Sequence, residues 1–198
     1  MRLIPLGWWE FPLWLVVMGV TVWFCSREVL DLRSPFWGRS CILGLVVFAV
    51  WIGPEALIPG YREHWLFQNP ITGSLWGTLD PALRDDGWVL ALRTLRAVFI
   101  APIVEELFWR AWLMRWLIDS DFRRLPLGAW SASSFCISAV LFAAEHGPYW
   151  EVGLLAGLAY NGWMVRTRSL GDCILAHGVT NAALSFYTIA TGKWEFWF

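Results

Sequence analysis

The stretch Ala97-Val-Phe-Ile-Ala-Pro-Ile-Val-Glu-Glu-Leu-Phe-Trp-Arg110 decides the fold, because it places three charged side chains inside a run that is otherwise apolar. Charged groups in the interior of a bilayer cost several kcal/mol unless they are paired, and those found there usually serve a function. The stretch therefore predicts a membrane helix that carries a functional cluster made of Glu105, Glu106 and Arg110.

The composition of the whole chain agrees with a membrane protein. Hydrophobic residues make up 58% of the 198 residues and charged residues only 16%, whereas about 25% of an average soluble domain is charged. The mean hydropathy is +0.51. Because about 20 residues cross a bilayer as a helix, the length predicts an all-α, polytopic bundle of about six transmembrane helices. Residues 1–198 form a single integral membrane domain in this prediction.

The apolar runs give the positions of the predicted spans. These are residues 8–25, 40–58, 97–118, 130–145, 150–165 and 171–190. The third stretch is expected to start earlier, at Trp88, and to run along the membrane interface before it enters at about Ala97. Pro102 is expected to loosen the third span, since its ring removes one helical hydrogen bond. In the fifth span, the small residues Gly153, Ala156 and Gly157 favour close contact with a neighbouring helix.

A long polar segment separates the second and third spans. Residues 59–87 are rich in glycine and proline, which indicates loops with, at most, a short helix around residues 61–67. A segment of this size is either a lid or substrate entrance above a site, or a plain surface connection.

Basic residues give an orientation for the bundle. The loops on one side hold Arg27, Arg33, Arg39, Arg115, Arg123, Arg124, Arg166 and Arg168, and the other side holds Arg2, Arg62, Arg84 and Lys193. Cytoplasmic loops carry an excess of Lys and Arg, so the first side is predicted to be cytoplasmic and both termini to lie outside.

Charge and cysteine content exclude other classes of function. The net charge is −1 and the pI is near 6.3, so no basic field exists for nucleic acid. The four cysteines are scattered without a Cys-x-x-Cys pair, which argues against a zinc ribbon or a thioredoxin-like redox site.

Helix geometry divides the roles within the charged cluster. Glu106 and Arg110 are four residues apart and share a face, so they can pair, whereas Glu105 points about 100 degrees away. We expect Arg110 to neutralise and position Glu106, and Glu105 to face a cavity. A poorly solvated carboxylate is a stronger base.

Two later segments supply polar partners for Glu105. His146 ends the fourth span, and His177 and Asn181 share one face of the sixth. Glu105 and His146 can activate a water while His177 and Asn181 stabilise the oxyanion of an attacked peptide carbonyl. Equally, Glu105, His146 and His177 can hold a divalent metal such as zinc. The sequence does not decide between a metal-independent site and a metal site.

A non-catalytic membrane protein is the competing interpretation, either a scaffold or immunity-type factor that keeps the fold, or a small carrier that uses the buried charges. A carrier is expected to show repeated halves with paired broken helices, and this chain shows no such duplication.

The motifs, taken together, resemble those of the CAAX proteases and bacteriocin-processing enzymes (CPBP), a family of membrane endopeptidases. That pattern is Glu-Glu-x-x-x-Arg, then Phe-x-x-x-His, then His-x-x-x-Asn. It is matched here by Glu105, Glu106, Arg110, Phe142, His146, His177 and Asn181. The resemblance covers about residues 95–190, the predicted catalytic core. Val104-Glu-Glu-Leu-Phe-Trp-Arg110 and the ending Ala190-Thr-Gly-Lys-Trp-Glu-Phe-Trp197 are most similar to short members associated with exosortase sorting systems.

The resemblance implies cleavage of a membrane-associated protein or peptide by a water that the first glutamate and first histidine activate. It implies the bilayer as surroundings, a bacterial inner membrane as location, and an exosortase sorting system as partner. Glu145 departs from the simple motif, because it adds a carboxylate beside His146 that can pair with it or act as another metal ligand.

Overall fold

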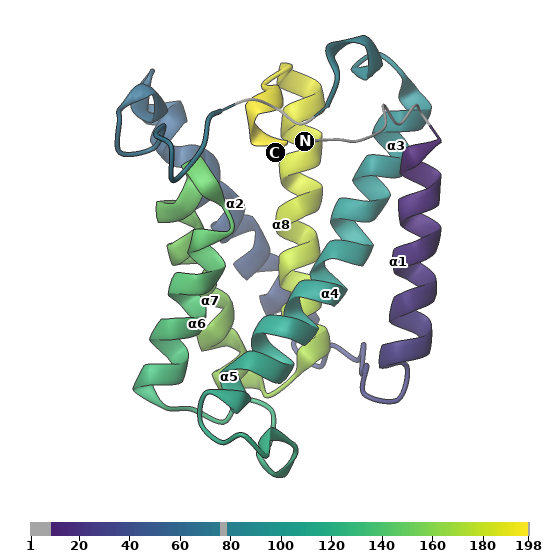
Figure 1. Cartoon of the computed structure of the whole chain (residues 1–198), viewed down its shortest axis with the longest axis vertical. Helices are drawn as coiled ribbons and strands as arrows, with labels where there is room; N and C mark the ends of the chain where they lie inside the picture. Colours follow the sequence, from purple (N-terminus) through teal and green to yellow (C-terminus); the bar gives the residue numbers. More distant parts are fainter. Residues whose placement is uncertain (1–8, 76–78, 198) are drawn as a thin grey trace.

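The computed structural model describes residues 9–75 and 79–197 (Figure 1). Helices are the main regular elements of these residues, and no β-strand occurs among them. The helices are α1 (Glu10–Ser26), α2 (Trp37–Leu57), α3 (Gly87–Leu95), α4 (Ala101–Glu106), α5 (Met114–Trp116), α6 (Ala132–Ala144), α7 (Trp150–Thr167) and α8 (Leu170–Thr191). Two π-helical turns, Arg96–Ile100 and Leu107–Leu113, join α3, α4 and α5 into one continuous helix. The described residues thus form six helices, and the prediction of an all-α fold is confirmed.

Three of these helices are long and apolar enough to cross a membrane: α2, the continuous helix Gly87–Trp116, and α8. Helices α1 and α6 are apolar but shorter. With 13 residues, α6 is about 20 Å long at 1.5 Å per residue, which is less than the thickness of the hydrocarbon core. Five of the six helices begin and end within three residues of the predicted spans, whereas the third, Gly87–Trp116, begins ten residues before the predicted entry at residue 97. Residue 8, the start of the first predicted span, and Arg2, used in the predicted orientation, lie outside the described residues.

Helix α8 lies in the middle of the bundle and packs against α2, α4 and α7 (Figure 1). Small residues allow the closest approaches: a Cβ added at Gly44 of α2 would collide with the backbone of Ala176 in α8. A Cβ at Gly157 of α7 would lie 3.2 Å from Cα of Ala139 in α6. The predicted close contact through the small residues of the fifth span is therefore confirmed.

The segment that follows α2 is fixed to the start of α7 by a buried arginine. Arg62 is 1% exposed, and it pairs with Glu151 at 2.7 Å and donates to the carbonyl oxygen of Pro148 at 2.8 Å. Its guanidinium lies 4.0 Å from the ring centre of Tyr149. Such a buried, charge-paired contact requires that this part of the segment is anchored in the folded state.

The expected short helix at residues 61–67 is only a 3₁₀ turn, Tyr61–Glu63. The carboxylate of Glu55 accepts the backbone N–H groups of Gly60 and Arg62, and the chain becomes extended at His64, with ψ at 142°. These local contacts fix a turn and end the helix before it can lengthen.

Candidate functional site

The backbone of the third helix is irregular just before its two glutamates. The N–H of Ala101 donates to Arg96 O, five residues back, as in a π-helix. Pro102, five residues after Ala97, has no N–H to give. The carbonyl oxygen of Ala97 instead accepts from Nδ2 of Asn181 in α8, at 2.8 Å. The expected loosening at Pro102 therefore occurs, and Asn181 compensates for it.

Glu106, Arg110 and His177 form a buried charged cluster. Arg110 donates to Glu106 Oε1 at 3.0 Å, as the helical spacing predicted, and both residues are almost completely buried. The same Oε1 atom accepts from His177 Nδ1 at 2.8 Å. One carboxylate oxygen thus joins the third helix to α8.

Arg110 is held from its other side by residues of α7 that the sequence analysis did not single out. Its Nε donates to Asn161 Oδ1 at 3.1 Å. The amide nitrogen of Asn161 in turn donates to Phe135 O and Ser138 Oγ of α6, both at 2.9 Å. A polar asparagine inside an apolar helix was the available sequence signal. Asn161 therefore orients Arg110, which orients Glu106.

Aromatic rings enclose the same cluster. The guanidinium of Arg110 lies 4.6 Å from the ring centre of Phe142 and 5.3 Å from that of Tyr160, distances at which cation–π attraction is expected. The ring of His177 stacks on Tyr160 at 5.1 Å. These contacts exclude water from the cluster, and hydrogen bonds within it are stronger for that reason.

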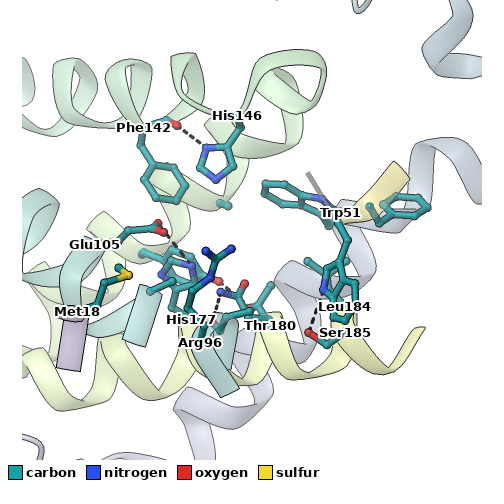
Figure 2. A pocket seen from close by; sticks show the side chains of 17 residues that line it. Met18, Trp51, Arg96, Glu105, Phe142, His146, His177, Thr180, Leu184 and Ser185 are labelled. Atoms are coloured by element: carbon teal, nitrogen blue, oxygen red, sulfur yellow. Dashed lines mark hydrogen bonds and ion pairs between the residues drawn. The ribbon is translucent and has the colours of Figure 1, made fainter. Parts of the chain in front are cut away.

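Glu105 lines a cavity beside this cluster and faces His177 (Figure 2). Its Oε2 atom has no hydrogen-bond partner among the described residues, and it lies 3.8 Å from His177 Nε2. The side chain is 30% exposed, so it can reach both the cavity and the histidine. The predicted division between Glu105 and Glu106 is thus present in the structure.

His146 faces Glu105 across the cavity from the end of α6 (Figure 2). Its Nδ1 atom lies 2.6 Å from the carbonyl oxygen of Phe142. Because a carbonyl only accepts, Nδ1 carries the hydrogen and Nε2 of the neutral ring carries the lone pair. Gly153 of α7 packs close behind, since a Cβ there would lie 3.2 Å from the Cβ of His146. The ring is thereby fixed in one tautomer and one position.

Glu145 joins the site from the exposed side. Its Oε1 atom accepts from Trp109 Nε1 at 3.1 Å. Glu105, Glu145 and His146 each offer a ligand atom within 4.8 Å of the others. This grouping contains Glu145 in the place that the sequence analysis gave to His177. Two carboxylates and one imidazole are a donor set that suits a divalent metal such as zinc.

The cavity that Glu105 and His146 face has a volume of about 290 Å³. The predicted site residues that line it are Glu105, His146, His177 and Asn181. Glu106 and Arg110 support it from behind, because Glu106 bonds to His177. All six predicted residues thus belong to one continuous arrangement.

The wall toward the C-terminus was not found from the sequence. Phe196 and Trp197 follow α8, fold back and line the cavity, where they are 3% and 6% exposed. The hydroxyl of Tyr149 donates to Glu195 O at 3.2 Å, and burial raises its pKa, so it remains a neutral donor. Arg93 donates to Trp197 O at 3.0 Å. These bonds hold the aromatic wall in place.

The fold and the site define a helical membrane protein with a buried charged cluster beside a small polar cavity. Residues 87–183 match the family model of the Rce1-like type II CAAX prenyl endopeptidases. This range runs from the start of α3 into α8 and includes all six predicted site residues. Comparison with curated proteins and with solved structures gave no match. Residues 87–183 therefore form a domain of the Rce1-like type II CAAX prenyl endopeptidase family, whose members are integral membrane proteins.

Proposed function

We propose that the chain is an intramembrane endopeptidase that hydrolyses a peptide bond of a membrane-associated protein or peptide. The observation that carries the proposal is the Oε2 atom of Glu105, a buried carboxylate oxygen without a hydrogen-bond partner among the described residues. Leaving such an atom without a partner is costly. Its position on a cavity opposite His146 suits the binding of a water that will react.

In this mechanism a water lies between Glu105 Oε2 and His146 Nε2. Glu105 takes a proton from the water while the water oxygen attacks the carbonyl carbon of the substrate. The carbonyl oxygen becomes an oxyanion. When the carbon–nitrogen bond breaks, the proton held by Glu105 passes to the departing amine. The products are a carboxylic acid and an amine, so no other reactant is needed.

His177 and Asn181 are the proposed donors to the oxyanion. Nδ1 of His177 already donates to Glu106, so donation from Nε2 to the oxyanion requires the doubly protonated ring, with Glu106 as its counter-charge. Asn181 uses one amide hydrogen for Ala97 and keeps a second. Removing one oxyanion donor costs about 10²- to 10³-fold in kcat in a well-studied protease.

The donor set of Glu105, Glu145 and His146 also fits a divalent metal. A metal ion bound there would lower the pKa of its water. The chain's own contribution would remain the same: Trp109 orients Glu145, and the Phe142 carbonyl orients His146. Metal analysis of the purified protein, with activity measured in the presence of a chelator and after zinc is added back, separates the two modes.

The setting of the enzyme follows from the same proposal. Six membrane spans, with α1, α6 and α7 added to the three long apolar helices, would place the cavity within the bilayer region. A bacterial inner membrane and a partnership with an exosortase system rest on the resemblance of residues 104–110 and 190–197 to short members of the family. The name of the matched family includes a prenylated substrate, so lipidated and plain peptides are both candidates.

The test uses purified full-length protein and candidate membrane peptides, with and without a prenyl group. Glu105→Gln and His146→Ala are expected to lower kcat at least ~100-fold, since each removes a group that acts on the water. Glu63→Gln and His64→Ala are the matched controls, because both residues are exposed. Cleavage at the wild-type rate by Glu105→Gln and His146→Ala would refute the mechanism. Absence of cleavage by wild-type protein in membranes that contain its native neighbours would favour a scaffold.

A further inference from the structure

The structure contains a second cavity, of about 730 Å³, whose lining includes Trp112 and Arg115 next to and within α5. In Figure 1, α5 lies at the end of the bundle opposite the C-terminus. Four segments line it: the connection after α1, the third helix, the connection from α5 to α6, and the start of α8. The lining residues are Glu28, Val29, Leu107, Ala111, Trp112, Arg115, Phe122, Arg123, Leu127 and Leu170. This second cavity is separate from the site described above.

Its lining combines a long apolar surface with two arginines. Arg115 donates to the carbonyl oxygens of Ala111 and Leu125, and its guanidinium lies 5.3 Å from the ring centre of Phe122. Neither carbonyl neutralises its charge. Arg123 is exposed and forms no ion pair with any described residue. Its neighbour Arg124, by contrast, pairs with Asp121 at 2.5 Å and does not line the cavity.

The chemistry of the lining selects the occupant. The lining is largely apolar and carries two arginines against one carboxylate, Glu28, so its net charge is positive. Such a surface complements a molecule with a hydrocarbon chain and an anionic head. In a bilayer, the available molecule of that kind is an anionic phospholipid. The arginine count predicts that this end of the bundle is on the cytoplasmic side, where anionic head groups attract basic residues.

We propose that the second cavity binds one anionic phospholipid, with its phosphate between Arg115 and Arg123 and an acyl chain along Leu107 and Leu127. Leu107 and Ala111 belong to the π-helical turn that also carries Arg110. The bound lipid would therefore contact the same helix that positions the buried charged cluster, and would support it from within the second cavity. This proposal does not depend on the proposed peptidase activity.

Binding is measured by native mass spectrometry and by the thermal midpoint of the delipidated full-length protein, titrated with phosphatidylglycerol. We expect one saturable bound lipid and a rise in Tm. Arg123→Gln and Arg115→Gln should each weaken binding about five-fold, because each variant loses the attraction of one basic residue to an anionic head group. Glu28→Gln should strengthen it, because Glu28 is the one carboxylate in the lining. Arg124→Gln is the matched control and should bind like wild type.

Two further arms separate the possible sources of an effect. Val29 is 67% exposed, so Val29→Trp can fill the mouth of the cavity without disturbing the core, and it should reduce lipid binding while all charges stay. Inorganic phosphate alone should not raise Tm. The proposal is overturned if phosphate gives the same rise, if phosphatidylethanolamine binds as tightly as phosphatidylglycerol, or if Arg123→Gln and Val29→Trp both bind like wild type.

Discussion

Asn181 of α8 donates through Nδ2 to the carbonyl oxygen of Ala97, 2.8 Å away in the third helix. The bond satisfies a carbonyl that the π-helical turn and Pro102 leave without a helical donor. It also places the amide of Asn181 on the wall of the cavity. One side chain thereby has a structural role and a proposed catalytic role.

Asn181→Leu should remove both roles at once. The Ala97 carbonyl would lose its partner, which costs about 1–3 kcal/mol, and Tm measured by differential scanning fluorimetry should fall. The kcat should fall further than this destabilisation explains, because an oxyanion donor is lost. Asn181→Gln, which keeps the amide at a different reach, should recover part of the Tm and little of the kcat. Full activity in a stable Asn181→Leu variant would remove Asn181 from the mechanism.

Glu106→Gln should destabilise the protein strongly. Removing one partner of a buried ion pair costs about 3–5 kcal/mol, and here it leaves Arg110 without a counter-charge inside the bundle. Arg110→Met should cost a similar amount. The double variant should be less unstable than the sum of the two, since it buries no unpaired charge. Additive losses in a double-mutant cycle would show that the two residues are not coupled.

Asn161→Ala tests the support behind Arg110. The variant loses the hydrogen bond to Nε of Arg110 but leaves the Glu106 pair in place, so kcat should fall while KM changes little. Arg110→Lys should lower kcat in the same way, because lysine cannot bond to Asn161 and Glu106 together. Ser133→Ala, at an exposed position of α6, is the control. An unchanged kcat in Asn161→Ala would limit Asn161 to packing.

Local sequence patterns predicted those features that depend on a single helix. The pair Glu106 and Arg110 followed from spacing on one helix, and the close contact at Gly157 followed from residue size. The position of Asn161 under Arg110 depends on how α7 is registered against the third helix, and no local pattern encodes that register. The π-helical turns change that register further.

The same limit applies to two buried residues that lie outside the long helices. Trp197 and Arg62 lie in stretches without helical periodicity, so nothing in their neighbours indicates burial. Their burial depends on contacts between different elements: with Arg93 and Ser185 for Trp197, and with Glu151 for Arg62. Tertiary packing alone decides such positions.

Trp197→Ala should widen the cavity beside the proposed scissile bond. The lost side chain leaves room for a larger substrate residue, so cleavage of peptides with bulky side chains should rise relative to those with small ones. Removing this buried ring lowers the free energy of unfolding by about 3–5 kcal/mol. Trp197→Phe is a milder variant that should shift the preference less. Trp88→Ala, at a position 62% exposed, should leave the preference unchanged. An unaltered ranking of peptides in both Trp197 variants would exclude this wall from substrate selection.

Arg62 decides between the two interpretations of the segment after α2. If the segment is a fixed connection, its backbone amides at residues 60–72 should exchange slowly in the wild-type protein. Arg62→Met should then speed their exchange, because Glu151 loses its partner and the guanidinium no longer reaches the Pro148 carbonyl. The turn that carries His146 would lose its support, and kcat should fall.

If the segment opens as a lid, the wild-type amides should already exchange fast, and Arg62→Met should change them little. Hydrogen exchange followed by mass spectrometry, with Glu63→Gln as the control, separates the two interpretations. We expect slow exchange, because the Arg62 side chain that pairs with Glu151 is almost inaccessible to water.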